Sequence, residues 1–201
     1  MIITAIKQQA QRKDRYSIFV DGAYAFSLSE SGLIESRLAS GQELSTAELK
    51  ALRKAAGIDR AYSNGLRYVA LRPRSEWEMR EYFRRKGVDV SVAQHIIDRL
   101  RAVGLIDDLA FARAWIAHRR LLKSTSLRRL RLELQQKQVP SAIVDQVLAE
   151  DTTDDQQALR RLIAKKQARY PDAQKFMQYL ARQGFSYDAI KTALSSADSD
   201  N

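Results

Sequence analysis

Gly104-Leu105-Ile106-Asp107-Asp108-Leu109-Ala110-Phe111-Ala112-Arg113-Ala114-Trp115 begins the most informative segment of the sequence. It begins with a turn and two carboxylates, and it continues as a helix with one apolar face. A second helix, rich in arginine, follows and ends near Lys137. From Arg113 to Lys137 the only acidic residue is Glu133, against eight basic residues: Arg113, Arg119, Arg120, Lys123, Arg128, Arg129, Arg131 and Lys137.

The composition limits the classes of function. The 201 residues carry a net charge of +10 and include no cysteine. Such a basic chain favours a polyanionic partner or an acidic protein surface. The lack of cysteine excludes disulfides, thiolate nucleophiles and cysteine zinc sites, and it fits a reducing, cytoplasmic location. Apolar runs are too short to span a bilayer, and no secretion signal is visible, so we expect no membrane association.

The central stretch is one unit of a threefold repeat. Val88, Val139 and Phe185 are equivalent, and apolar residues recur at fixed distances before and after each of them. Each is also preceded by a good helix N-cap, at Ser75, Ser126 and Asp172. Glycines suited to a helix C-terminus precede Val88 and Phe185, whereas the middle repeat has Gln138. A left-handed Gln138 would cost about 1 kcal/mol relative to glycine. Each repeat is therefore predicted to contain three helices.

The N-terminal part has a different pattern. Residues 15–20 and 23–28 are rich in aromatic and β-branched residues, and Asp21-Gly22 between them suits a type I′ turn, so we predict a β-hairpin. A third strand is expected at 2–9, and a short helix around 30–39. Ser45-Thr46-Ala47-Glu48 forms a capping box that opens another helix, which we expect to stop at Gly57.

We therefore predict a mainly α-helical protein in which tandem three-helix repeats, similar to helix-turn-helix units, form an elongated array after a small N-terminal β-hairpin or sheet region. The predicted parts are an N-terminal hairpin extension with a short helix at 1–44, a connecting helix at 45–58, three-helix repeats at 59–103, 104–150 and 151–196, and a disordered tail at 197–201.

Four motifs together resemble the RecX regulatory family. They are Leu71-Arg72-Pro73-Arg74-Ser75-Glu76, Arg85-Lys86-Gly87-Val88, Gly104-Leu105-Ile106-Asp107-Asp108 with Phe111-Ala112, and Arg182-Gln183-Gly184-Phe185. The resemblance covers about residues 59–196, with Gln138 as a departure from the family's usual glycine, and the hairpin region is similar to the extension of longer members. It implies tandem three-helix repeats and a protein that binds the RecA recombinase filament and modulates it, usually as an inhibitor.

The first helix of the middle repeat has an apolar stripe that contains one arginine. The stripe consists of Phe111, Ala112, Trp115, Ile116 and Leu122. Arg119 lies within this stripe, so we expect a carboxylate, Asp107 or Asp108, to neutralise it. Arg113 and Arg120 lie on the opposite side, where they either contact a partner or are simply solvated.

The second helix of this repeat gives the main candidate for a binding surface. Leu127, Leu130 and Leu134 should point inward. The outward residues are Arg128, Arg129, Leu132, Gln135 and Gln136, and Lys123 and Lys137 lie at the two ends of the helix. An apolar residue framed by arginines resembles a protein contact. The alternative is that Leu132 packs on a neighbouring repeat.

A second basic and aromatic patch contains Arg72, Arg74, Trp77 and Arg80. Trp77 could stack on a nucleobase. Packing of the indole over the start of its helix is the simpler interpretation.

The sequence allows two other classes of function to be compared with this one. Sequence-independent DNA binding fits the charge, but the third helix of the middle repeat offers Asp145, Gln146 and Glu150, which suit a major groove poorly. Binding to single- or double-stranded DNA should then be weak and salt-dependent. An enzyme such as a nuclease is disfavoured, because Asp107 and Asp108 are better explained as helix-start residues, and His95 and His118 lack zinc spacing. We expect no cofactor, no metal and a monomer.

Overall fold

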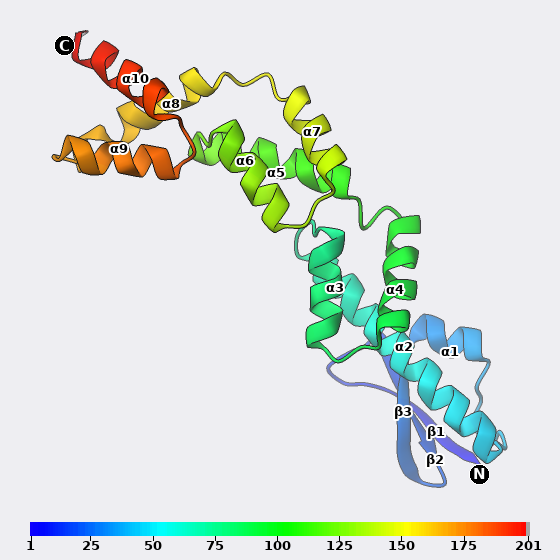
Figure 1. Ribbon diagram of the computed structural model, residues 1–201. Coiled ribbons are helices and arrows are strands. Elements are labelled where there is room, and N and C mark those ends of the chain that lie inside the picture. The colour runs from blue at the N-terminus through cyan, green and yellow to red at the C-terminus, as the bar shows by residue number, and fades with distance from the viewer. Residues whose placement is uncertain (200–201) are drawn as a thin grey trace. The chain divides into compact units, whose positions relative to one another are not determined.

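The computed structural model describes residues 1–199, with side chains described as far as Ser195 (Figure 1). Its elements are β1 (Ile3–Gln8), β2 (Arg15–Val20), β3 (Ala23–Ser29), α1 (Glu30–Ser36), α2 (Thr46–Ala70), α3 (Glu76–Arg85), α4 (Val90–Ala102), α5 (Asp108–Lys123), α6 (Leu127–Gln136), α7 (Ser141–Glu150), α8 (Asp155–Lys166), the short 3₁₀ helix η1 (Gln167–Arg169), α9 (Ala173–Arg182) and α10 (Tyr187–Ser199). Helix triplets after an N-terminal antiparallel sheet confirm the predicted fold class.

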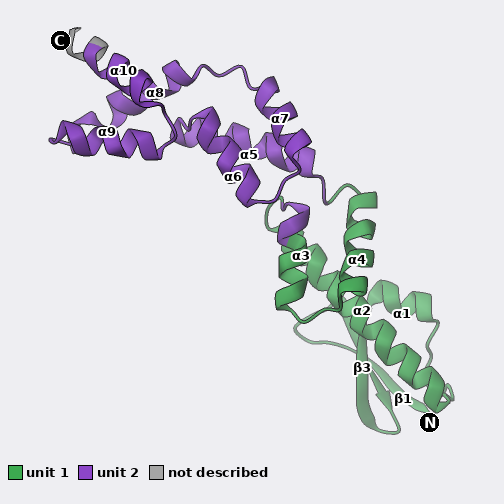
Figure 2. Ribbon diagram, in the orientation of Figure 1, with its two compact units in different colours: residues 1–73, 79–105 green, residues 74–78, 106–201 purple. Residues whose placement is uncertain are grey.

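The chain forms two compact units, shown in green and purple in Figure 2. The first unit contains residues 1–73 and 79–105. The second contains residues 74–78 and the chain from 106 onward. The first turn of α3 therefore belongs to the second unit, and the remainder of α3 belongs to the first.

The three strands of the first unit form an antiparallel sheet in the order β1-β2-β3. Asp21 and Gly22 both have positive φ, 49° and 81°, which is the backbone geometry of a type I′ turn. Val20 pairs with Ala23 across this turn. The hairpin and the third strand are thus confirmed.

Helix α2 begins as the sequence predicted and ends later. The amide of Glu48 donates to the Ser45 side chain, and the Ser45 amide donates to the Glu48 carboxylate, so the capping box is present. The expected end at Gly57 is wrong, because α2 continues to Ala70. Leu49 and Ala56 are buried against the sheet. This packing of the helical turns before Gly57 outweighs the helix penalty of about 1 kcal/mol that glycine carries.

A buried ion pair ties α2 to the sheet. Arg15, only 1% exposed, lies on β2, and its Nη2 is 3.1 Å from Oδ2 of Asp59 on α2. The same guanidinium donates to the Ser27 carbonyl on β3 at 3.0 Å. Asp59 also accepts the amide of Ser29 at 2.9 Å. A charged group this deeply buried requires such pairing, so the cluster fixes the position of α2 on the sheet.

The first helix triplet is α2-α3-α4, and its core depends on the close approach of α2 to a side chain of α3. Phe83, Ile96 and Leu100 are fully buried. A Cβ atom added to Gly65 of α2 would lie 2.8 Å from Cζ of Phe83, so α2 needs glycine there. Helix α3 ends at Arg85, and Gly87, two residues later, turns the chain with a φ of +67°.

The second unit contains two further triplets, α5-α6-α7 and α8-α9-α10, each with its own core. Ser126 and Asp172 cap α6 and α9 by accepting main-chain amides. Gln138 has a φ of +52° and Gly184 a φ of +93°, so Gln138 does adopt the left-handed conformation. Helix α10 extends to Ser199, into the range 197–201 where a tail was expected; residues 200 and 201 lie outside the described residues.

Candidate partner-binding surface

The buried and exposed side chains of α6 are those that the helical period predicts. Leu130 and Leu134 are fully buried in the core of the α5-α6-α7 triplet. On the opposite side Arg128, Gln135 and Gln136 are exposed, and Leu132 is 45% exposed. An apolar side chain of this size in water, between polar neighbours, is a feature of contact surfaces.

The end of α5 adds apolar surface that the sequence did not single out. Leu121 is 82% exposed and Lys123 is also exposed. Leu122, expected in the buried stripe, is 54% exposed, so that expectation is wrong. Helix α5 ends one residue later, at Lys123, and Ser124 turns the chain with a φ of 45°. The core formed with α6 and α7 therefore does not reach Leu122.

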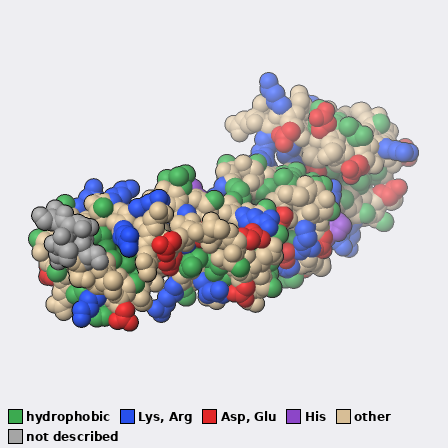
Figure 3. Space-filling model, turned by 90° about the horizontal axis from the view of Figure 1, so that it is seen from above, with side chains coloured by type: hydrophobic (Ala, Val, Ile, Leu, Met, Phe, Trp, Pro, Cys, Tyr) green, Lys and Arg blue, Asp and Glu red, His purple; other side chains and the backbone are tan. Residues whose placement is uncertain are grey.

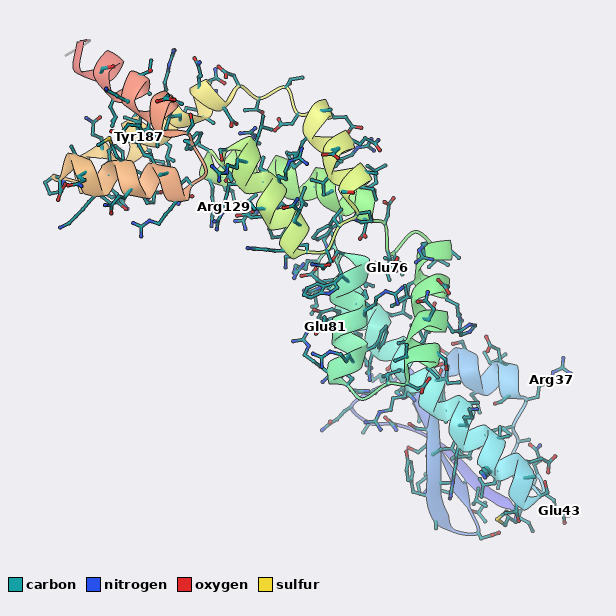
Figure 4. All side chains as sticks on the ribbon, viewed as in Figure 1. Arg37, Glu43, Glu76, Glu81, Arg129 and Tyr187 are labelled. Atoms are coloured by element: carbon teal, nitrogen blue, oxygen red, sulfur yellow. The ribbon has the colours of Figure 1, made fainter. Side chains whose placement is uncertain are left out.

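Arg119 is neutralised by a carboxylate, but not by either of the two that were predicted. Its Nε lies 2.7 Å from Oε2 of Glu133 on α6. The same oxygen accepts the indole N–H of Trp115 at 2.9 Å, and the other oxygen is 3.4 Å from Nε of Arg129, labelled in Figure 4. The Arg119 guanidinium also lies over the Trp115 ring, 4.7 Å from its centroid. Glu133 is thus the centre of the contact between α5 and α6.

Asp107 and Asp108, the carboxylates predicted for Arg119, instead bind helix-start amides. Asp107 caps α5 by accepting the amides of Leu109 and Ala110 at 2.8 and 2.9 Å. Asp108 accepts the amide of Glu76, at the start of α3, at 2.8 Å. Their interpretation as helix-start residues is confirmed.

Lys137 also takes part in this network. Its Nζ is 2.7 Å from Oε1 of Glu78 and lies over the Trp115 ring, 5.3 Å from the centroid. Glu78 is only 7% exposed. Lys137 therefore neutralises a buried carboxylate, which leaves little of its charge for a partner.

Arg113 is exposed, as expected, and is paired. Its Nε is 2.8 Å from Oε2 of Glu150, at the end of α7. Hydrogen bonds from Arg113 and from Gln146 lower the pKa of Glu150 to about 2.

Arg120 is not a surface residue, contrary to the prediction. Its side chain is only 9% exposed and lies 2.8 Å from Asp151 and 3.1 Å from Asp155. The acidic connector between α7 and α8 folds back onto the end of α5, which periodicity along α5 alone cannot indicate. Burial favours a higher pKa for Asp151, but hydrogen bonds from Arg120 and Thr153 outweigh it and lower the pKa.

The second predicted patch is divided between the two units. Arg72 lies in the first unit, is exposed and donates to the Pro73 carbonyl at 2.9 Å. Arg74 and Trp77 lie in the second unit. Trp77 is 39% exposed, so its indole is neither fully buried nor free of packing. Its role in stacking on a nucleobase stays a prediction.

Most of the central basic residues are neutralised within the second unit. Six of the eight pair with a carboxylate: Arg113, Arg119, Arg120, Arg129, Arg131 and Lys137. Lys123 and Arg128 have no carboxylate partner among the described side chains. We define the α6 surface as Lys123, Arg128, Leu132, Gln135 and Gln136. Figure 3 likewise shows Lys and Arg side chains interspersed with Asp and Glu on the face that it presents.

The described residues include no group of three or more His, Asp or Glu side chains placed to hold a metal ion. No helix within residues 1–199 combines the length and the apolar character needed to cross a bilayer.

These observations define a mainly α-helical repeat protein, in which three-helix units follow a small antiparallel sheet. Comparison with known families gives the same division. The Regulatory protein RecX N-terminal domain matches residues 1–45, and the first, second and third RecX three-helix domains match residues 61–100, 107–148 and 153–194. Residues 46–60 lie between these matches.

Two curated relatives and two solved structures are similar along most of the chain. Regulatory protein RecX of Geobacillus kaustophilus is 34% identical over 96% of this chain and 76% of its own length. That of Levilactobacillus brevis is 31% identical over 98% and 76%. A crystal structure of regulatory protein RecX matches with a TM-score of 0.72 and 29% identity over 96% of this chain and 98% of that one. RecX from Lactobacillus salivarius matches with a TM-score of 0.59 and 25% identity over 70% and 96%.

The chain belongs to the RecX family of regulatory proteins, as its motifs predicted. Family membership implies a regulatory role rather than a known enzymatic one.

Proposed function

We propose that this protein binds the RecA recombinase–DNA filament and inhibits its recombinase, ATPase and co-protease activities by occupying the filament groove. The support is membership of the RecX family together with the α6 surface. There, Leu132 is 45% exposed between polar neighbours, and Arg128 is a cation with no carboxylate partner among the described residues. This combination of apolar centre and free cation suits contact with another protein.

The inhibition needs no chemistry of its own. A chain of small helical units can touch several subunits of a filament at once, because each unit presents its own outward face. Occupancy of the groove would obstruct DNA exchange and substrate access. Leu121 and Leu122 extend the apolar surface at the end of α5, next in the chain to Lys123.

Co-sedimentation with RecA filaments tests this proposal. The variant Arg128→Glu with Leu132→Ser should lose most of its filament binding and its inhibition of ATP hydrolysis. Arg182→Glu with Gln178→Ser is the matched control, because it makes the same charge change on exposed residues of α9 in the next triplet. If both double variants bind as the parent does, the α6 surface is not the contact.

A second candidate function is sequence-independent binding of bare DNA, on single or double strands. The net charge of +10 favours it. Inhibition that arises only from bare-DNA binding should disappear when extra DNA is supplied, whereas inhibition through the filament should persist.

A further inference from the structure

The first part of α2, which lies between two matched family domains, carries a row of cations with no assigned role. Lys50, Arg53, Lys54 and Arg60 of α2 are all exposed. Arg53, Lys54 and Arg60 follow Lys50 by three, four and ten residues, which places all four within one broad face of the helix. We call these four residues together with Gly57 the α2 stripe. All five residues lie within residues 46–60, outside the RecX domain matches.

The cations of the α2 stripe are not neutralised. None of the four makes an ion pair or hydrogen bond with any described side chain, which contrasts with the α5-α6-α7 triplet. The α2 carboxylates nearest in sequence are engaged elsewhere, Glu48 with Ser45 and Asp59 with Arg15. Asp89 of α4, which Lys54 influences electrostatically, caps its own helix through Ser91 and Val92.

Gly57 lies at the centre of the stripe. Its neighbours on the helix surface are Arg53 and Lys54, four and three residues before it, and Arg60, three residues after it. A Cβ atom added to Gly57 would meet nothing within 4 Å, so no packing explains a glycine in this helix. Glycine weakens a helix interior, and its remaining use is to let another backbone approach closely.

Like charges at these spacings also weaken the helix. Lys50 repels Arg53 and Lys54, three and four residues away, when nothing neutralises them. A bound polyanion would relieve this repulsion, whereas a solvated face would leave it in place.

We propose that the α2 stripe binds the phosphodiester backbone of nucleic acid, with a phosphate group approaching the helix at Gly57. From Lys50 to Arg60 the helix rises roughly 15 Å. That length spans about four nucleotides of one strand at 3.4 Å each, so the cations can contact several phosphates of the same strand. The proposal rests on the bare-DNA candidate above and gives that candidate a location on the chain.

The salt dependence of binding to a fluorescently labelled oligothymidylate, without RecA, tests the stripe. In the variant Lys50→Gln/Arg53→Gln/Arg60→Gln we expect the slope of log affinity against log salt to fall by about 2, since each lost contact removes about 0.7. The matched control is Arg84→Gln/Arg113→Gln/Arg131→Gln, which loses the same net charge from cations paired with Glu81, Glu150 and Asp145. Its slope should change much less.

Two results would overturn the proposal. An equal loss of slope in both variants would mean that total charge matters and location does not. Unchanged oligonucleotide affinity in the stripe variant, together with lost binding to RecA filaments, would assign the stripe to an acidic protein surface. The oligonucleotide assay contains no RecA. A result that contradicts nucleic-acid binding by the α2 stripe therefore leaves the proposed filament contact of the α6 surface untouched.

Gly57→Gln gives a second, independent readout. It should raise the thermal stability of the protein, since glutamine favours a helix, and lower oligonucleotide affinity severalfold by blocking close approach. Ala55→Gln is the control, because it lengthens an exposed side chain of α2 off the stripe and should leave affinity unchanged. Unchanged affinity in Gly57→Gln would exclude a phosphate at this position.

Discussion

The Ser126 hydroxyl donates a hydrogen bond of 2.8 Å to the main-chain carbonyl of Gln183. The same oxygen caps α6 by accepting the amide of Arg129 at 3.1 Å. One side chain thus starts a helix of one triplet and binds the end of α9 in the next. Ser75, its equivalent at the start of α3, likewise donates to the carbonyl of Lys137 at 3.0 Å. The contact therefore repeats with the period of the chain.

A second hydrogen bond lies beside each of these two serine contacts. The amide of Glu76 donates to Asp108 at 2.8 Å, and the amide of Leu127 donates to Asp155 at 3.0 Å. In both cases, a carboxylate at the start of one helix binds the first amide of another. The polar residues at these starts therefore join triplets as well as cap helices.

Substitutions at Gly184 and Gln138 should have opposite effects on stability. A Cβ atom at Gly184 would lie 2.4 Å from the Ser126 oxygen, and its φ is +93°. Gly184→Ala should therefore destabilise the protein by about 2 kcal/mol or more, the sum of backbone strain and a forced shift. Gln138→Gly should stabilise it by about 1 kcal/mol. Urea unfolding measures both, and changes of the same sign would contradict this account.

Arg120→Gln should affect stability rather than partner binding directly. It leaves Asp151 and Asp155 without the guanidinium that lies 2.8 and 3.1 Å from them. Removal of one member of a buried ion pair typically costs about 3 kcal/mol or more. Hydrogen exchange should accelerate in the connector between α7 and α8. Arg128→Gln, on the exposed face of α6, serves as the control and should leave that exchange unchanged.

Acid should weaken the contact between α5 and α7. The pKa of Glu150 is about 2 in the folded chain, below its ordinary value of 4.5, so the folded state binds this proton less readily than the unfolded state. Its contribution to stability is complete above pH 4.5 and is lost as the pH falls toward 2. In Arg113→Gln, an NMR titration should show this pKa moving up toward 4.5. Arg84→Gln, which affects Glu81, should leave the pKa of Glu150 in place.

The Arg15–Asp59 pair should behave as a coupled unit. Arg15→Met removes a guanidinium that is 1% exposed and leaves the Asp59 carboxylate without its cation, so it should cost about 3 kcal/mol or more. Arg15→Met with Asp59→Asn should cost less than the sum of the single changes. Chemical denaturation of the four proteins gives the coupling energy. Simple additivity would mean that the pair does not act together.

The parts of the fold that depend on local pattern could be predicted from the sequence. Ser126 and Asp172 cap helices, and Asp21-Gly22 forms the hairpin turn, because each depends on a few neighbouring residues. The inward and outward faces of α6 follow from the helical period alone.

The predictions that were wrong concern residues whose surroundings are formed by segments distant in the sequence. Gly57 is a helix breaker by propensity, yet packing of α2 on the sheet keeps the helix continuous. Arg120 is buried because the connector at Asp151 folds over it, and Arg119 meets Glu133 because α6 lies beside α5. The sequence therefore predicted correctly where the basic residues cluster, but more of them are paired with carboxylates than expected. The choice of binding residues stays a prediction.

Because α2 is one uninterrupted helix, the sheet and the first helix triplet cannot be separated by cutting the chain between them. Leu49 and Ala56 on its first half belong to the same core as Ile3 and Ile18 of the sheet, whereas Gly65 on its second half fits against Phe83. A shortened protein that lacked the strands would expose the apolar face of α2 and would tend to aggregate. Engineers who want the repeats alone would have to redesign that surface with polar side chains first.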